Sequence, residues 1–310
     1  MTIFPRCARR SKTCRSTWEN SLQPQLKKIT VNGAELAYFE WGEPRADAPT
    51  LFFVHATGFH ARVWDYHIEA FPEHHVIALE QRGHGRSQKL AVQTWRTFGE
   101  DQAAFVQALG LSRLIGVAHS MGAHGMIDGA VRSAAFDRLL LLDPTVMGPE
   151  QYATEYPDPF GGELHPASKR RNSFSSAEDM AARIGDKSAF PLFHPRILRD
   201  YCEYGLEPDP AGGFRLACPP EVEARVYMAA RSNAAVYDSI RALDIPVTVV
   251  RAKLPDPDAL HDFSSSPTWP GLAQEFPDGR DLHWADCTHF IPMQRPDQVI
   301  ELIAEQIANW

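Results

Sequence analysis

The stretch R-L-I-G-V-A-H-S-M-G-A-H-G-M-I-D-G-A, residues 113–130, decides how this chain folds. It opens with an apolar run, residues 114–118, which has the length and composition of a buried strand. The chain then turns sharply at residues 119–122, and small residues that let a helix pack close to a sheet follow. Strand, sharp turn and helix form the context in which a serine is held exposed on a strained turn, and Ser120 occupies that place.

The residues two before and two after such a serine must be small, because the neighbouring backbones nearly touch there. Ala118 and Gly122 occupy these positions. The usual pattern, G-x-S-x-G, has glycine first, so Ala118 is a departure from it. The alternative interpretation is an ordinary strand–helix junction in which Ser120 is only the helix N-cap.

Length and composition limit the classes of protein to which this chain can belong. A chain of 310 residues with 44% hydrophobic content suits one large α/β domain with an insertion, or two domains. The formal net charge of −8 argues against a general nucleic-acid role. No apolar run approaches the roughly 20 residues that span a membrane. Five scattered cysteines form no C-x-x-C pair, which indicates a reducing compartment, and we expect a cytoplasmic protein.

Residues 1–24 differ from the rest of the chain. Five basic residues precede the first acidic one, Glu19, and no apolar segment follows them, so this is not a secretory signal. An extension without ordered structure is the favoured interpretation, and an organelle transit peptide is the alternative. We expect no chemistry from this segment.

Strand and helix patterns then alternate. Asn32-Gly33 between residues 28–31 and 34–41 predicts a hairpin. Apolar runs predict strands at 50–55, 75–79 and 136–142, with a helix over 95–109. After residue 230, strands are expected at 246–251 and 281–285, a helix near 269–276, and a closing helix over 296–310. This alternation predicts a mostly parallel sheet covered by helices.

The pattern changes between residues 144 and 230. Proline, glycine and charged residues become frequent, and amphipathic helical stretches occur at 176–184, 195–204 and 220–231. We interpret residues 144–230 as a helical cap inserted into a core made of residues 25–143 and 231–310.

With these elements in place, the chain resembles the α/β-hydrolase superfamily over roughly residues 28–310. The resemblance rests on four motifs in order: H-A-T-G-F at 55–59, E-Q-R-G-H-G-R-S at 80–87, A-H-S-M-G at 118–122 and C-T-H-F-I-P at 287–292. The second motif usually begins with Asp, where this chain has Glu80. The resemblance implies an eight-stranded, mostly parallel sheet flanked by helices, with a helical cap, as in the esterase, lactonase and C–C-hydrolase branch.

A serine hydroxyl needs a base within hydrogen-bond reach and a carboxylate that orients the base. Ser120 is the candidate nucleophile. The resemblance makes His289 the base, because it follows a late strand and a short polar loop. Other histidines near these motifs are interpreted as structural: His119, His261 and His283.

Three residues are candidates for the carboxylate that orients His289. Asp256 is preferred, because the stretch R-A-K-L-P-D at 251–256 resembles the R-G-x-x-S-D of the family. Asp143, at the end of an earlier strand, is the second candidate, and it could instead cap a helix that starts at Pro144. Asp258 is the third.

The resemblance also implies that the backbone N–H groups of Met121 and Thr57 stabilise the oxyanion. We expect His55 to support the loop that carries Thr57. The candidates for the substrate pocket, each with core packing as the alternative, are His55, Trp64, Trp95, His124, Tyr152 and Tyr227.

The sequence therefore predicts a serine hydrolase that cleaves a small-to-medium carboxylic ester or lactone through an acyl-enzyme. The alternatives are C–C bond hydrolysis, perhydrolysis or acyl transfer on the same fold, and a non-catalytic ligand-binding homologue. No metal or other cofactor is expected, because H-E-x-x-H and G-x-G-x-x-G spacings are absent. The expected partner is a small-molecule substrate, and the expected state is a monomer or homodimer.

Overall fold

The computed structural model describes residues 23–153, 161–256 and 264–310, and an eight-stranded sheet forms its centre. Along the sheet the strands run in the order β1-β2-β4-β3-β5-β6-β9-β10. The first two pairs, β1–β2 and β2–β4, are antiparallel, and all later pairs are parallel. The strands are β1 (Gln25–Val31), β2 (Ala34–Trp41), β3 (Thr50–Val54), β4 (Val76–Glu80), β5 (Leu114–His119), β6 (Phe136–Leu142), β9 (Val247–Arg251) and β10 (Gly279–His283).

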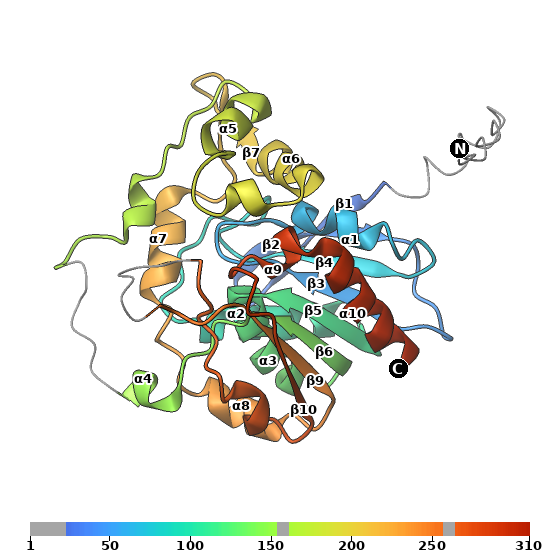
Figure 1. Ribbon diagram of the computed structural model, residues 1–310. Coiled ribbons are helices and arrows are strands. Elements are labelled where there is room, and N and C mark those ends of the chain that lie inside the picture. The colour runs from blue at the N-terminus through green and yellow to red at the C-terminus, as the bar shows by residue number, and fades with distance from the viewer. Residues whose placement is uncertain (1–22, 154–160, 257–263) are drawn as a thin grey trace, which may run out of the picture.

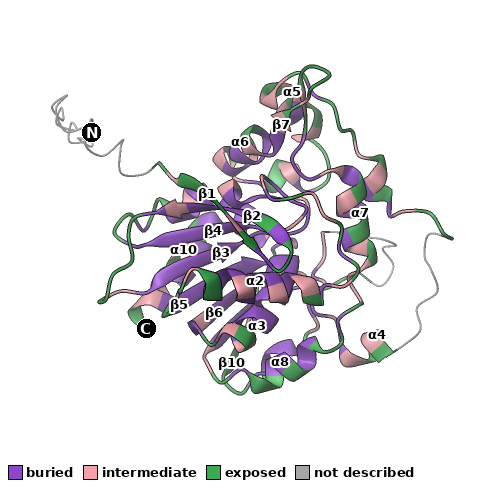
Figure 2. Ribbon diagram, turned by 180° about the vertical axis from the view of Figure 1, so that it is seen from behind, coloured by how far each residue is buried: buried purple, intermediate pink, exposed green. Residues whose placement is uncertain are grey.

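Helices cover both faces of this sheet. α1 (Asp65–Ile68) and α10 (Pro296–Ala308) lie in front in Figure 1, whereas α2 (Arg96–Ala108), α3 (Met121–Ser133) and α8 (Val236–Ala242) lie in front in the reversed view of Figure 2. Neighbouring residues of β3 serve opposite faces: Phe53 packs in the cluster of α10, and Phe52 in that of α2 and α3. Every residue of β3 is buried, because successive side chains point into the two covered faces.

The α/β-hydrolase fold predicted from the sequence is present. At the hairpin, Asn32 and Gly33 both have positive φ, 46° and 72°, as a two-residue turn of this kind requires. Two expectations were inaccurate. The helix near 269–276 is only a 3-10 turn, Leu272–Glu275, and the following strand covers 279–283 rather than 281–285. The short helix α8 was not predicted, since seven residues carry too few apolar repeats to show a helical period.

We call residues 144–230 the cap segment. Its helices are α4 (Pro149–Ala153), α5 (Ala177–Ile184), α6 (Pro195–Tyr204) and α7 (Pro220–Met228). In Figure 1 the helices α5, α6 and α7 lie above and to the left of the sheet, whereas α4 lies below, near α8. The segment is not purely helical as expected, because β7 (Leu206–Pro208) and β8 (Phe214–Leu216) form an antiparallel pair. Their loop turns through Gly212 and Gly213, both with positive φ. That the cap segment is a separate domain stays a prediction.

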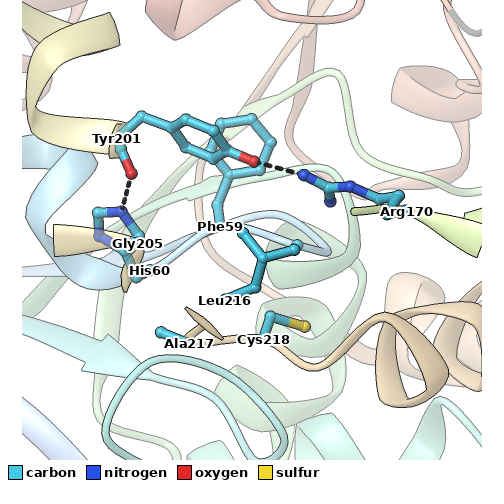
Figure 3. Close-up of a pocket in the computed structure, with 9 residues that line it drawn as sticks. Phe59, His60, Arg170, Tyr201, Gly205, Leu216, Ala217 and Cys218 are labelled. Atoms are coloured by element: carbon cyan, nitrogen blue, oxygen red, sulfur yellow. Dashed lines mark hydrogen bonds between the residues drawn. The ribbon is translucent and has the colours of Figure 1, made fainter. Parts of the chain in front are cut away.

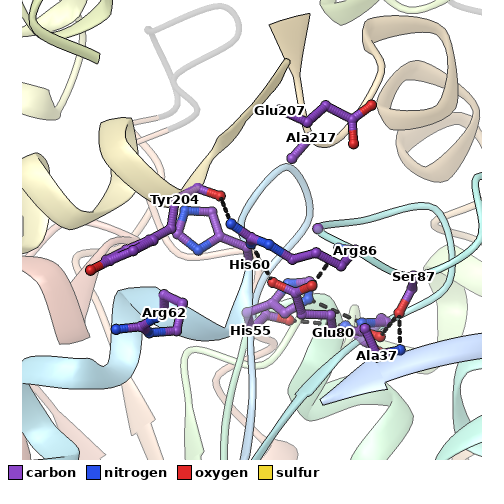
Figure 4. A network of polar contacts seen from close by, with 12 residues as sticks. Ala37, His55, His60, Arg62, Glu80, Arg86, Ser87, Tyr204, Glu207 and Ala217 are labelled. Carbon is purple, nitrogen blue, oxygen red and sulfur yellow. Dashed lines mark hydrogen bonds and ion pairs between the residues drawn. The ribbon is translucent and has the colours of Figure 1, made fainter. Parts of the chain in front are cut away.

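A buried ionic contact ties the cap segment to the sheet (Figure 4). The carboxylate of Glu80, at the end of β4, has no solvent exposure and accepts a 2.8 Å hydrogen bond from Arg86. Arg86 also donates to the backbone oxygen of Tyr204 in α6, at 2.7 Å. A Cβ at Gly85 would collide with the Glu80 carboxyl group. The longer side chain of Glu80, compared with the usual Asp of this motif, therefore requires glycine in the loop that covers it.

Burial also affects a set of histidines. Those with at most 1% exposure are His55, His60, His67, His84, His119 and His124. Desolvation lowers the pKa of each of them, to about 3 for His60 and to about 4 for His67, His84 and His124.

Because of these buried histidines, we expect the folded protein to become less stable in acid. In the unfolded chain a histidine has a pKa near 6.5, so below about pH 6.5 the unfolded state binds protons that the folded state does not. The free energy of unfolding should fall by roughly 1.4 kcal/mol per pH unit for each such histidine, and for His67, His84 and His124 this loss should level off near pH 4. Urea denaturation between pH 7.5 and 5 measures this. His67→Gln should reduce the slope by about one proton, and an unfolding midpoint that does not change with pH would contradict the prediction.

Candidate active site

The turn between β5 and α3 holds Ser120 in a strained conformation. Its φ of 57° and ψ of −122° lie outside the regions that non-glycine residues ordinarily adopt. The helix starts at the next residue, Met121. A Cβ at Gly122 would collide with the backbone oxygen of His55, so the turn presses directly against the loop after β3. Only glycine fits at position 122.

Ser120, His289 and Asp143 form a continuous hydrogen-bonded chain. The Oγ of Ser120 lies 2.9 Å from Nε2 of His289, and Nδ1 of His289 lies 2.6 Å from Oδ2 of Asp143. A carboxylate only accepts hydrogen bonds, so Nδ1 carries the proton and Nε2 is free to accept the proton of Ser120. The pairing of Ser120 with His289 is therefore the geometry expected from the sequence, and it can move a proton off the serine.

The preference for Asp256 as the acid was wrong, because Asp143 occupies the position beside His289. Asp143 follows β6, has no solvent exposure, and its Oδ1 accepts three hydrogen bonds: from the N–H of Ala252 at 2.9 Å, from Ser266 Oγ at 2.5 Å and from Thr268 Oγ1 at 3.2 Å. These donors compensate for the burial of the carboxylate.

Asp256 lies beyond the end of β9 and is exposed, and Asp258 lies outside the described residues. The neighbouring histidines have other contacts. His119 is buried, and its Nε2 lies 2.8 Å from the backbone oxygen of His289, so it holds the main chain of that residue. His283 is exposed on β10, and His261 lies outside the described residues.

The loop after β3 meets the serine turn from the other side. Thr57 Oγ1 donates to the sulfur of Met121 at 3.3 Å. As the first residue of α3, Met121 has a backbone N–H without an acceptor inside the helix. His55 fixes the loop: its Nε2 accepts the N–H of Gln81 at 3.1 Å, and its Nδ1 donates to the oxygen of Ala56 at 2.8 Å. The two N–H groups of the expected oxyanion hole thus belong to touching segments, and their role stays a prediction.

A cavity of about 850 Å³ opens onto Ser120 and His289. This volume lies within the range usual for small-molecule sites. Among the predicted pocket residues, Trp95 and Tyr227 line it. Trp64 does not, because it is fully buried in the core against Phe53.

The other pocket candidates also have positions outside the cavity wall. His55 lies behind the loop that it supports. Tyr152 packs on Tyr237, with ring centroids 6.1 Å apart. His124 contacts Trp95 from behind, at 5.1 Å between ring centroids, and its Nδ1 lies 2.9 Å from the backbone oxygen of Thr145. The sequence alone could not separate these side chains, because an aromatic residue can line a pocket or pack in the core.

Two parts of the cavity wall were not predicted from the sequence. Thr145 lines the cavity, with its Oγ1 at 3.1 Å from Ser120 Oγ. The second part is an ionic cluster: Arg170 bonds to Glu223 at 2.5 Å and donates to the hydroxyl of Tyr201 at 3.1 Å. Figure 3 shows the Tyr201 hydroxyl turned toward Arg170. These residues lie in the cap segment, in which the sequence contains no recognisable motif.

The cluster rests against the loop that carries Thr57. A Cβ at Gly58 would lie 2.7 Å from Oε1 of Glu223, so the buried carboxylate touches the backbone of this loop. The Tyr201 hydroxyl and the Glu223 carboxylate, which both accept hydrogen bonds from Arg170, raise the pKa of Arg170, and its guanidinium stays protonated.

Within residues 23–153, 161–256 and 264–310, no group of three or more His, Cys, Asp or Glu side chains is arranged to hold a metal ion. In the same part of the chain, no helix is long and apolar enough to cross a membrane.

Comparison with known proteins agrees with this geometry. A bifunctional esterase/perhydrolase of Acinetobacter calcoaceticus is 36% identical over 100 residues, which are 30% of this chain and 34% of that protein. A non-heme chloroperoxidase of Burkholderia pyrrocinia is 27% identical over 194 residues, 57% of this chain and 67% of that protein. The match to the first relative thus spans about a third of its length.

Among solved structures, the crystal structure of E-2-(acetamidomethylene)succinate hydrolase is similar, with a TM-score of 0.72 and 18% identity over 93% of this chain and all of that one. This likeness concerns the fold. The family model described as "Alpha/beta hydrolase family" matches residues 51–302. Since that match runs from the central strand β3 into the closing helix α10, the chain belongs to the alpha/beta hydrolase family.

Proposed function

We propose that this protein hydrolyses carboxylic esters through an acyl-enzyme formed on Ser120. The observation that carries the proposal is the hydrogen-bonded chain from Ser120 through His289 to Asp143, whose serine end opens into the cavity. A serine on an ordinary strand–helix junction would need neither the strained φ nor a histidine paired with a buried carboxylate.

In the proposed mechanism, Ser120 Oγ attacks the ester carbonyl while Nε2 of His289 takes its proton. Asp143 stabilises the resulting imidazolium. The oxyanion accepts hydrogen bonds from the N–H groups of Thr57 and Met121, of which one is typically worth about 2.7–4 kcal/mol. His289 then protonates the departing alcohol, and afterwards activates the water that cleaves the acyl-enzyme.

A second candidate is perhydrolysis, in which hydrogen peroxide replaces water as the nucleophile that cleaves the same acyl-enzyme. The names of two relatives, an esterase/perhydrolase and a non-heme chloroperoxidase, favour it. Both reactions use the same residues, so the ratio of peracid to acid formed in the presence of peroxide distinguishes them.

We further propose that the preferred ester carries no charge. Aromatic and aliphatic side chains form much of the cavity wall. Its cation Arg170, which is only partly buried, is already paired with the buried Glu223, so the pair contributes little net charge to the cavity. Lys187, which also lines the cavity, is exposed to solvent, where its attraction for a substrate anion is weakened.

Glu223→Gln tests this view of the cavity. The variant leaves the charge of Arg170 uncompensated in a largely desolvated wall, so kcat/KM for mono-p-nitrophenyl succinate should rise about tenfold relative to that for p-nitrophenyl butyrate. Steady-state kinetics on both esters at pH 8 measures the ratio. Glu221→Gln, an exposed change on the same helix, is the matched control. If Glu223→Gln leaves the ratio at its wild-type value, the pair does not set the preference for charge.

The proposed function itself is tested by labelling with a fluorophosphonate, followed by peptide mapping, and by turnover of p-nitrophenyl esters of increasing acyl length. We expect one label per chain, on Ser120, and competition between ester and label. Folded protein that takes no label would refute an activated Ser120 and favour the non-catalytic alternative. Labelling without ester turnover would favour C–C bond cleavage or acyl transfer.

A further inference from the structure

Thr145 is held against the nucleophile by more than its side chain. Its Oγ1 lies 3.1 Å from Ser120 Oγ, and its backbone N–H donates to the backbone oxygen of Ser120 at 3.2 Å. Its own backbone oxygen lies 2.9 Å from Nδ1 of His124. Nε2 of His124 in turn lies 3.1 Å from Nδ2 of Asn233. Thr145 is therefore fixed by contacts on both sides of its peptide unit.

The directions of these hydrogen bonds follow from donor and acceptor types. The amide nitrogen of Asn233 only donates, so Nε2 of His124 accepts and its Nδ1 carries the proton given to Thr145. This fits a buried, neutral His124, whose pKa burial lowers to about 4. At the nucleophile, Nε2 of His289 takes the hydroxyl proton of Ser120. The hydroxyl of Thr145 must then be the donor, and Ser120 Oγ the acceptor.

We propose that Thr145 is a catalytic residue of deacylation, which donates a hydrogen bond to Ser120 Oγ as this atom leaves the acyl group. The proposal rests on the proposed function, since it needs an acyl-enzyme on Ser120. Nothing in the family match or the relatives' names assigns a role to this residue.

Deacylation proceeds in two stages. Water attacks the acyl carbon and gives one proton to Nε2 of His289, which forms the tetrahedral intermediate. The bond between the acyl carbon and Ser120 Oγ then breaks, its electron pair stays on Oγ, and His289 returns the proton to Oγ. The product leaves as the carboxylic acid. Thr145 keeps its own proton throughout.

The contribution of Thr145 differs between the two halves of the reaction. In the acyl-enzyme, Oγ is an ester oxygen and a weak acceptor, and it becomes a strong acceptor as the bond to carbon breaks. A donor at 3.1 Å therefore stabilises the transition state of deacylation more than the acyl-enzyme. In acylation the order is reversed, because free Ser120 is already a good acceptor and loses electron density as it attacks. Thr145 should therefore speed deacylation, whereas its opposing effect on acylation should change the rate of attack by Ser120 by no more than about twofold.

The test compares two rates in the full-length wild type, Thr145→Val, Thr145→Ala and Thr145→Ser. The rate of fluorophosphonate labelling reports attack by Ser120 without deacylation, and turnover of p-nitrophenyl acetate includes both. We expect Thr145→Val and Thr145→Ala to lower kcat about tenfold, as for one lost hydrogen bond to a developing charge, with labelling within about twofold of wild type. Acetylated enzyme should accumulate by intact mass, and Thr145→Ser should restore turnover.

Parallel losses of labelling and turnover in both Thr145→Val and Thr145→Ala would overturn the proposal in favour of a purely structural role. Unchanged turnover would overturn it too. If the wild type itself takes no label and forms no acetyl-enzyme, the proposed function fails, and this result is distinguishable because it does not depend on residue 145.

Discussion

Ser120→Ala is expected to lower kcat for p-nitrophenyl butyrate by about 10⁵- to 10⁶-fold, because it removes the Oγ that lies 2.9 Å from Nε2 of His289 and is proposed to attack the ester. The residual rate would come from the oxyanion donors and from substrate binding alone. The substitution removes one oxygen that contacts His289 and Thr145 and leaves the backbone in place, so the protein should fold. Steady-state kinetics, together with the thermal unfolding midpoint, measures both effects.

Ser133→Ala provides the matched control at the far end of the same helix. The hydroxyl of Ser133 makes a long contact of 3.5 Å to the backbone oxygen of Ala130, and it lies away from the cavity wall. Its turnover should stay within about twofold of wild type, as for substitutions away from special features. If Ser120→Ala retained more than a hundredth of the activity while Ser133→Ala behaved normally, another residue would be the nucleophile.

Asp143→Asn is expected to lower kcat by about 10⁴-fold while the cavity keeps its shape. Oδ1 of Asp143 accepts three hydrogen bonds, so the amide oxygen of an asparagine would stay on that side. Its NH₂ group would then face Nδ1 of His289 and force the ring proton onto Nε2. In that tautomer His289 cannot accept the proton of Ser120.

Asp256→Asn is the informative partner of this variant, since the sequence alone favours Asp256 as the acid. Its carboxyl group is exposed beyond β9, and its replacement should leave kcat within about twofold of wild type. Kinetics on the two variants with one ester decides between the residues. Loss of activity in Asp256→Asn with retention in Asp143→Asn would contradict the arrangement described here.

Much of the fold could be predicted because its determinants are local. The apolar run of β5, the small residues around Ser120 and the Asn32-Gly33 turn each specify backbone geometry within a few residues. The bounds of β6 agree with the sequence pattern, since its last four residues, Leu139–Leu142, form a continuous buried apolar run. The short helix α8 and the pair β7–β8 lie in segments too short for a period to be visible.

The acid could not be chosen from the sequence, because β6 and β9 are neighbours in the sheet. Both strands end at the same edge, with Leu142 opposite Val250, so a carboxylate after either of them starts near His289. Asp143 directly follows its strand, and its positive φ of 46° turns it toward the N–H of Ala252. Asp256 comes several residues after its strand has ended, where the chain has reached the surface.

From the sequence alone, most strands and helices of the core and the strained serine turn could be predicted, because these depend on apolar periodicity and on small residues at close approaches. The pairing of Ser120 with His289 was predicted from the family resemblance. Only the tertiary structure decided that Asp143 orients His289, that Thr145 contacts the nucleophile and that Glu223 neutralises Arg170. These contacts join residues from different strands and from the cap segment. Their distances depend on how the layers pack, and no local pattern in the chain encodes that packing.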